Sequence, residues 1–487
     1  MTGEEIQKMQ TTYTMQSWSK QKGLKPIPVE RSEGIYFYDT DGKRYADMSS
    51  QQVNVNLGYG NKAIGDAIKA KVDKYCYIGP SFGDEDRAKL GKAIIDLLPD
   101  TFGKVFFTNA GADANENAIK IARMYTGRNK VFSRYRSYHG SSFGAGNLTG
   151  EPRRYPLEPG IPGFIKFFDP YIYREPLDFA SEEEATRYYL AKLREQVIYE
   201  GADRIAAIEV ETITGSNGII IPPKGYLPGI RKICDEFGIV MICDEVMAGF
   251  GRTGKMFAFE NFDVVPDIIT FAKGVTCGYI QLGGVAVSKK IAAYFDDHYL
   301  SCGLTYSAHP LACAAGVACV NYYQEANILD NVAVSGKVLG ELLEDLKAKH
   351  ACVGDVRYIG LFSGVELVKD KTTKEPLVPY GKDPGGVMGG ICKKLIFRHP
   401  HIFGNVEVAS SEEVLRNWDD LKRKEKHQET DTQALESVAK SLPSLIRAEK
   451  LQKKAAKVGF DWDNVKDALD KVCLLYTSPS PRDSTSS

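Results

Sequence analysis

The chain has 487 residues, which is too long for one compact core, so two or more domains are expected. Hydrophobic residues make up 43% and charged residues 26% of the sequence, values typical of a soluble globular protein. The net charge of −1 gives no electrostatic basis for binding nucleic acid or an anionic membrane surface.

The sequence has no clear pattern of a membrane span, a secretory signal, paired cysteines or a metal site. No apolar run approaches the roughly 20 residues of a membrane span, and MTGEEIQKMQTTYT at the start does not have the pattern of a secretory signal. Ten cysteines lie without CxxC pairs, several of them in apolar patterns, such as Cys234, Cys243 and Cys313. We interpret them as reduced core cysteines of a cytoplasmic protein. Seven histidines without zinc-like spacing predict no metal site.

In chain order, the sequence predicts a small antiparallel element, an α/β region and a helix-rich region. Gly34–Ala46 has the pattern of a β-hairpin around Asp41–Gly42. Between about residues 56 and 310, apolar runs alternate with amphipathic helices, which predicts a mostly parallel sheet with helices on both faces. Helices are expected within Pro310–Asp345 and a strand at Ile359–Val368. The expected sheet strands are Val105–Thr108, Lys130–Ser133, Ala206–Val210, Val240–Cys243, Ile268–Phe271 and Gly284–Val287.

An acid and a lysine each follow one of these buried strands. Asp244 ends the apolar run Met241–Cys243, a glycine-rich loop follows at Gly249–Gly254, and Lys273 comes directly after the next strand. The carboxyl ends of strands in an open α/β sheet form the ligand crevice. A lysine that forms a Schiff base and a carboxylate that keeps a pyridinium nitrogen protonated are the groups that pyridoxal phosphate chemistry needs.

The same stretch resembles a known family. The pattern D-E-V-x-x-G-F-G-R-T-G-K at Asp244–Lys255, followed by P-D-I-x-x-x-A-K-G at Pro266–Gly274, is similar to the class III (ω-amino acid) aminotransferases. The resemblance covers about residues 10–380 and implies the type I pyridoxal phosphate-dependent transferase fold. It implies a large cofactor-binding domain at 56–310, with a small α+β domain built from 1–55 and an incomplete 311–385.

The resemblance assigns roles around the cofactor ring. Lys273 is expected to form the internal aldimine and, once freed, to act as general acid and base. Asp244 is expected to stay ionised against the ring N–H, with Val246 on the ring face opposite Tyr138. Tyr138, in the family's Y-H-G, is expected to stack on the ring, with His139 beside it. Without the flanking motifs, Lys273 would be interpreted as an ordinary lysine after a strand, and Tyr138 as a core tyrosine in a loop.

A phosphate site is expected where a strand turns into a helix. Thr108–Arg123 reads TNAGADANENAIKIAR, and the N–H groups that begin such a helix can hold a phosphate. The resemblance places Gly111 and Ala112 at the phosphate-binding pair, where Ala112 replaces the usual Ser or Thr and removes one hydroxyl contact. A generic strand-to-helix turn is the alternative interpretation.

Two further residues have roles implied only by the resemblance. Glu211 stands where the family has E-P, followed here by Thr212, and is expected to be a substrate-site gate that pairs with an active-site arginine. A solvated carboxylate at a strand end is the alternative. Thr305 lies in LTYSAHPLACAA and is expected to reach the cofactor phosphate of the neighbouring subunit in a homodimer. A helix N-cap is an alternative role, compatible with the first.

The sequence departs from this family after about residue 385. Residues 393–418 and 442–472 resemble the helical MazG-type nucleoside triphosphate pyrophosphohydrolases, which predicts an all-α fragment over 386–473. The acidic clusters that such enzymes need for Mg²⁺ are absent from it. The last stretch, LLYTSPSPRDSTSS at 474–487, resembles sequencing-adaptor read-through and is predicted to be disordered. We hypothesise a chimeric reading frame.

The expected reaction is transamination between an ω-amino acid of the taurine, β-alanine or 4-aminobutyrate type and a 2-oxo acid, pyruvate or 2-oxoglutarate. Ser17–Trp18 and Ser49–Asn61 are most similar to members acting on such amines. Within the same fold a racemase, aminomutase or decarboxylase is an alternative. The sequence also leaves open an inactive or cofactor-binding-only chimera and, from the C-terminal part, a nucleoside triphosphate pyrophosphohydrolase.

Overall fold

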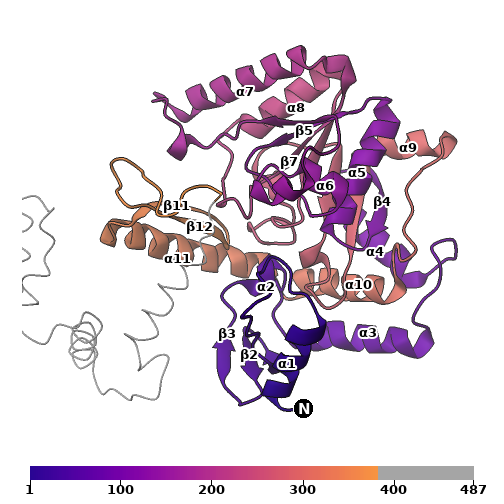
Figure 1. Cartoon of the computed structure of the whole chain (residues 1–487). Coiled ribbons are helices and arrows are strands. Elements are labelled where there is room, and N and C mark those ends of the chain that lie inside the picture. Colours follow the sequence, from indigo (N-terminus) through magenta and orange to yellow (C-terminus); the bar gives the residue numbers. More distant parts are fainter. Residues whose placement is uncertain (382–487) are drawn as a thin grey trace, which may run out of the picture. The chain divides into compact units, whose positions relative to one another are not determined.

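A seven-stranded sheet forms the centre of residues 1–381, the part of the chain that the computed structural model describes (Figure 1). The strand order is β4-β10-β9-β8-β7-β5-β6, and β10 alone runs antiparallel to both of its neighbours. The mostly parallel sheet is confirmed, and each expected sheet strand is present; the edge strand β6 was not predicted. The strands are β4 (Phe102–Thr108), β5 (Lys130–Arg134), β6 (Phe164–Phe167), β7 (Ile205–Glu211), β8 (Val240–Asp244), β9 (Ile268–Phe271) and β10 (Gly283–Ser288).

Helices cover both faces of this sheet. As a result, β7, β8 and β9 are buried along their whole length. One face, with Ala207 and Ile242, packs against α5 (Gly111–Thr126) and α9 (Lys289–Asp297). The other face carries Ile208, Val210 and Met241 in the larger apolar core. Helices that contribute to that core are α3 (Lys62–Lys74), α4 (Glu85–Asp96), α7 (Glu182–Tyr199), α8 (Tyr226–Phe237) and α10 (Pro310–Glu325).

The N-terminal region contains the predicted hairpin within a three-stranded antiparallel sheet. Helix α1 (Gly3–Tyr13) precedes β1 (Val29–Glu33), β2 (Tyr36–Asp39) and β3 (Arg44–Ala46). The next element, α2 (Ser50–Val53), is a single left-handed turn, since its four residues have φ values of 50°, 45°, 64° and 59°. This turn leads the chain toward the cavity described below.

After α10, the described chain continues through α11 (Ile328–Lys349) to a hairpin of β11 (Val353–Ile359) and β12 (Phe362–Leu367). The two helices are confirmed. The predicted single strand Ile359–Val368 is wrong at its start, because the chain reverses at Gly360, which has a φ of 57°. Strand β11 was not predicted.

Short helices complete the described part, and the expected 386–473 fragment and 474–487 tail lie outside it. Cys234, Cys243 and Cys313 are buried and unpaired, as predicted. No helix within residues 1–381 is long and apolar enough to span a bilayer. The short helices are α6 (Phe143–Leu148), η1 (Pro152–Leu157), η2 (Ile172–Arg174), η3 (Ala202–Arg204), η4 (Ala258–Asn261) and η5 (Lys273–Val275).

Candidate active site

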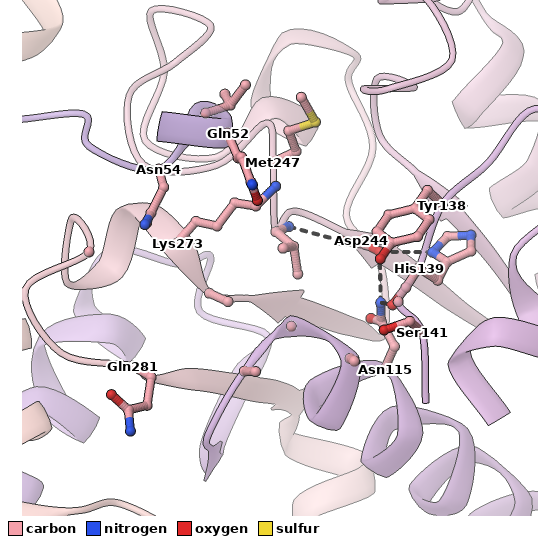
Figure 2. A pocket seen from close by; sticks show the side chains of 18 of the residues that line it. Gln52, Asn54, Asn115, Tyr138, His139, Ser141, Asp244, Met247, Lys273 and Gln281 are labelled. Atoms are coloured by element: carbon pink, nitrogen blue, oxygen red, sulfur yellow. Dashed lines mark hydrogen bonds and ion pairs between the residues drawn. The ribbon is translucent and has the colours of Figure 1, made fainter. Parts of the chain in front are cut away.

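A cavity of about 760 Å³ opens at the carboxyl ends of three neighbouring strands of the sheet. Glu211 ends β7, Asp244 ends β8, and Lys273 follows β9 after Ala272; all of them line the cavity. Figure 2 shows the Asp244 group on one side, with Lys273 reaching in from the other. The parallel register of β7, β8 and β9 therefore brings together residues that lie up to 62 positions apart in the sequence.

Asp244 is fixed by three hydrogen bonds (Figure 2). Its Oδ2 accepts from Asn115 Nδ2 at 2.9 Å and from His139 Nδ1 at 2.8 Å, and its Oδ1 accepts from Val246 N at 2.9 Å. An ionised carboxylate can only accept hydrogen bonds, so His139 must donate Nδ1–H to it. The arrangement holds a negative charge at a fixed place in the cavity wall, as a ring N–H partner requires.

Lys273 is half-buried at the start of the short helix η5 with a φ of 45°, a left-handed conformation that only a constrained site retains. Burial lowers the pKa of its amine, while the nearby Asp244 and Glu211 oppose that shift. The next residue must be glycine, because a Cβ on Gly274 would lie 2.7 Å from Phe250 Cβ, an atom fixed next to the backbone. The lowered pKa favours the neutral form of the Lys273 amine.

The N-terminus of α5 faces the same cavity. Asn109, Ala110, Gly111 and Ala112 line it, and no side chain caps the first turn of the helix. A Cβ on Gly111 would lie 2.8 Å from Val246 Cγ1, so this position has room only for glycine. The free N–H groups of the first turn and the positive end of the helix dipole fit a phosphate group.

Tyr138, His139 and Val246 also line the cavity. The His139 ring lies behind Asp244 and contacts its carboxylate (Figure 2). The guanidinium of Arg153 lies over the Tyr138 ring, 3.7 Å from the ring centroid. The structure thus brings every residue expected around the ring to one cavity.

Glu211 is buried in this cavity, 4% exposed, and so is not the solvated strand-end carboxylate of the alternative interpretation. Its carboxylate accepts from Tyr138 N at 2.9 Å and from Gly215 N at 2.8 Å. Burial raises its pKa. Thr212, which replaces the family's proline, donates its hydroxyl to Glu245 at 2.6 Å.

Thr305 does not line the cavity of its own chain. It is exposed, and its carbonyl oxygen accepts from the Tyr77 hydroxyl at 2.5 Å. The helix-cap alternative is wrong, since α10 begins at Pro310 and its cap is His309, whose Nδ1 accepts from Leu311 N. The expected contact with a neighbouring subunit remains a prediction.

Several lining residues were not predicted. Arg153 comes from the segment after helix α5, and Gln281 follows Lys273 by eight residues. Gln52 and Trp18 lie in the two stretches noted through the resemblance, but neither was given a role. The ring centroids of Trp18 and Tyr138 lie 6.4 Å apart in a T-shaped arrangement. The only signal for this group is polar or aromatic character in loops, which many surface residues share.

These residues fit pyridoxal phosphate, a cofactor that supplies an electron sink when it is bound. Asp244 offers a fixed negative charge for the ring nitrogen, the first turn of α5 offers N–H groups for the phosphate, and Lys273 offers a half-buried amine of lowered pKa for the aldehyde. Tyr138 and Val246 provide the side walls. The cavity also has space left for a substrate beside the cofactor.

Comparisons with known proteins agree with this geometry. Residues 18–416 match the Aminotransferase class-III family, so the match runs beyond residue 381. The chain is 35% identical to the taurine–pyruvate aminotransferase of Bilophila wadsworthia over 387 residues, 77% of this chain and 84% of that one.

Solved structures are similar over most of their length. One is the taurine:2-oxoglutarate aminotransferase of Bifidobacterium kashiwanohense in complex with pyridoxal phosphate and glutamate, with 48% identity and a TM-score of 0.79 over 87% of this chain and 97% of that one. Another is the (S)-enantioselective ω-transaminase of Thermomicrobium roseum, with 31% identity and a TM-score of 0.76 over 88% of this chain and 100% of that one. The chain therefore belongs to the class III aminotransferases and is a pyridoxal phosphate-dependent aminotransferase.

Proposed function

We propose that this enzyme transfers the amino group of an ω-amino acid with an anionic end to a 2-oxo acid. Taurine is the amine to test first, with β-alanine and 4-aminobutyrate next. One observation carries this proposal: Arg153 lines the same cavity as Lys273. A substrate with an amine at one end and an anion at the other can place its two ends on these two residues. The names of two similar proteins, both taurine aminotransferases, support the choice of taurine.

Arg153 is held in a position that suits an anion. Its guanidinium lies 3.7 Å from the Tyr138 ring centroid and 5.6 Å from that of Trp18, and its Nη2 donates to Ser216 Oγ at 2.8 Å. Burial lowers the pKa of Arg153, but a guanidinium keeps its charge in proteins. Its planar fork can bind two oxygens of a sulfonate or carboxylate at once.

Glu211 is proposed as the gate for this arginine. It lines the same cavity, and its negative charge partly opposes the lowering of the Arg153 pKa by burial. Without a substrate anion, the Arg153 guanidinium pairs with Glu151, whose Oε1 accepts from Arg153 Nε, and Glu211 adds a further negative charge that acts on the arginine. When a substrate anion binds Arg153, Glu211 is no longer needed to offset the charge of the arginine. Glu211 can then take up a proton, because burial already raises its pKa.

Lys273 and Asp244 are proposed to do the proton work. Lys273 would hold the cofactor aldehyde as a Schiff base, and once the substrate amine had replaced it there, the amine of Lys273 would move a proton to and from the reacting carbon of the substrate. The burial that lowers the pKa of Lys273 favours the neutral form that this task requires. Asp244 holds the proton on the ring nitrogen through its fixed position.

The test compares an anionic and an uncharged amine in the variant Arg153→Met. We expect kcat/KM for taurine to fall by about 10–100-fold, because a charge-assisted contact is lost. The rate with butylamine, which has no anionic end, should stay unchanged. Arg154→Met is the matched control, because Arg154 pairs with Glu158 at 3.0 Å and lines a separate cavity. Equal losses for both amines would contradict the proposal.

The acceptor is proposed to be 2-oxoglutarate or pyruvate. The relative with 48% identity is named for 2-oxoglutarate, and the one with 35% identity is named for pyruvate. We therefore test 2-oxoglutarate first. Turnover of taurine with each acid, followed as glutamate or alanine formed, decides between them.

We also propose a homodimer in which Thr305 contacts the cofactor phosphate bound by the other copy. Its exposure, away from the cavity of its own chain, agrees with such a role. The mass in solution should be twice that of one chain, and Thr305→Val should weaken cofactor binding about tenfold through the loss of one hydrogen bond. A monomer that binds the cofactor with full affinity would contradict this arrangement.

A further inference from the structure

A fully buried glutamate lies behind the cofactor site without any role so far. Glu209 is on β7, two residues before Glu211, so both side chains point to the same face of the sheet. Its exposure is 0%, and neither carboxyl oxygen has a hydrogen-bond partner among the described residues. A buried polar group without partners is uncommon in a folded protein and calls for a physical explanation.

The neighbours of Glu209 include the residues that hold the cofactor ring. Its Oε1 lies 3.8 Å from His139 Nδ1, and side-chain ligand atoms of Glu209, His139 and Asp244 all lie within 4.8 Å of one another. The other charged groups that act on it are Glu116 on α5 and Lys166 on β6.

Lys166 cannot neutralise Glu209 through a direct contact. Its ammonium donates to Ser133 Oγ at 2.9 Å and to the carbonyls of Asn147 and Leu148 at 2.7 and 2.8 Å. Burial also lowers the pKa of Lys166 to about 7. A carboxylate at Glu209 would therefore be buried without a donor and close to the charge of Asp244.

Electrostatics then favours the uncharged acid. Burying an ionised carboxylate without donors costs far more than burying a carboxylic acid. Burial is the main cause that raises the pKa of Glu209 well above its ordinary value, and the negative charge of Asp244 adds to the increase. A metal ion does not fit between the three groups, because His139 Nδ1 and Asp244 Oδ2 are already joined by a hydrogen bond of 2.8 Å.

We propose that Glu209 is a positioning residue that sets the charge of the cluster behind the cofactor ring by remaining an uncharged carboxylic acid. Asp244 is then the single carboxylate of the cluster, and a neutral His139 donates Nδ1–H to it. An ionised Glu209 would add a second negative charge beside Asp244. The inference rests on the pyridoxal phosphate site and not on the proposed amine donor.

The first readout is stability as a function of pH, measured on the full chain before cofactor is added. A raised pKa means that the folded protein keeps a proton that the unfolded chain releases. This contribution to stability is fully present below the ordinary carboxyl pKa and is lost as pH rises toward the folded pKa. Glu209→Gln carries no such proton, so its Tm relative to wild type should rise as the pH increases above the ordinary carboxyl pKa.

Glu260→Gln is the matched control for this measurement. Glu260 is exposed, and its Oε1 accepts from Phe257 N, a bond that glutamine can also accept. Its Tm difference from wild type should stay flat with pH over the same range. A flat difference for Glu209→Gln as well would overturn the proposal.

The second readout is spectroscopic. At neutral pH the infrared spectrum of the wild-type chain should contain the C=O band of a buried carboxylic acid, which Glu209→Gln loses and Glu209→Asp shifts. The absorption spectrum of the bound cofactor in Glu209→Gln should match wild type at neutral pH and diverge only at high pH. A neutral-pH infrared spectrum without an acid band that depends on Glu209 would contradict the proposal, as would a cofactor spectrum already altered there.

Discussion

The two ends of the cavity are built in different ways. At the cofactor end, Asp244 and Lys273 follow neighbouring buried strands, and Gly111 starts a helix packed on the same sheet. At the substrate end, Trp18 comes from a turn and Arg153 from the short helix η1, which lie far apart in the chain. The sheet fixes the first end through its register. The second end depends on loop contacts such as the Arg153 guanidinium over the Tyr138 ring.

Backbone strain occurs at both ends of the cavity, since Lys273 at the cofactor end has a φ of 45°. At the substrate end, the four residues of α2 have positive φ values, and Gln52 and Val53 from this turn line the cavity beside Asn54. Each left-handed residue other than glycine costs roughly 1–2 kcal/mol. Strain of this size persists where the surrounding structure requires a particular backbone path, and this turn brings polar side chains to the substrate end.

The largest effect is expected at the cofactor end, in Asp244→Asn. This change removes the negative charge and leaves the shape, so we expect kcat with any amine to fall by about 10²–10³-fold. Cofactor binding should persist, because the first turn of α5 and Lys273 are untouched. Steady-state rates and absorption spectra together check both expectations, and an unchanged kcat would show that Asp244 does not act on the ring.

Asn115→Ala provides a graded comparison with Asp244→Asn. It removes only one of three hydrogen bonds to the carboxylate, the one from Asn115 Nδ2 at 2.9 Å. We therefore expect kcat to fall by no more than about tenfold. A loss as large as that of Asp244→Asn would mean that the orientation of the carboxylate matters more than its charge.

The smallest effect is expected at the substrate end, in Gln51→Gly. Gln51 is exposed and has a φ of 45°, so glycine relieves the left-handed strain and should stabilise the protein by up to about 1 kcal/mol. The same change at Gln10, exposed in the right-handed helix α1, should destabilise it by about 1 kcal/mol. Urea unfolding midpoints measure both, and shifts of the same sign would show that α2 is not strained.

The difference between the two ends also explains what the sequence could predict. Asp244, Lys273, Gly111 and Tyr138 lie in local motifs next to strand or helix ends, and the sheet brings such ends together. Their meeting in one cavity could therefore be expected from the sequence. The central strands were predictable for the same reason, since each is a short apolar run.

The features that were missed depend on contacts between distant segments. Arg153 lines the cavity because the short helix η1 passes beside Tyr138 and Trp18, which no local pattern reveals. Strand β11 was missed because Asp355 and Arg357 interrupt its apolar residues, and β12 was misplaced because Gly360 supplies a reversal within an apolar run. Glu209 was hidden inside a strand, where a single acid gives no periodic signal.

The absorption spectrum of the full chain with pyridoxal phosphate, before and after taurine is added, tests the central claim most directly. We predict a cofactor absorption band that is lost in Lys273→Ala. Adding taurine without any 2-oxo acid should convert this band to the band of the aminated cofactor. This conversion would also separate an active enzyme from a chain that binds the cofactor without turnover. A band that persists in Lys273→Ala, or that taurine, β-alanine and 4-aminobutyrate all leave unchanged, would contradict the account.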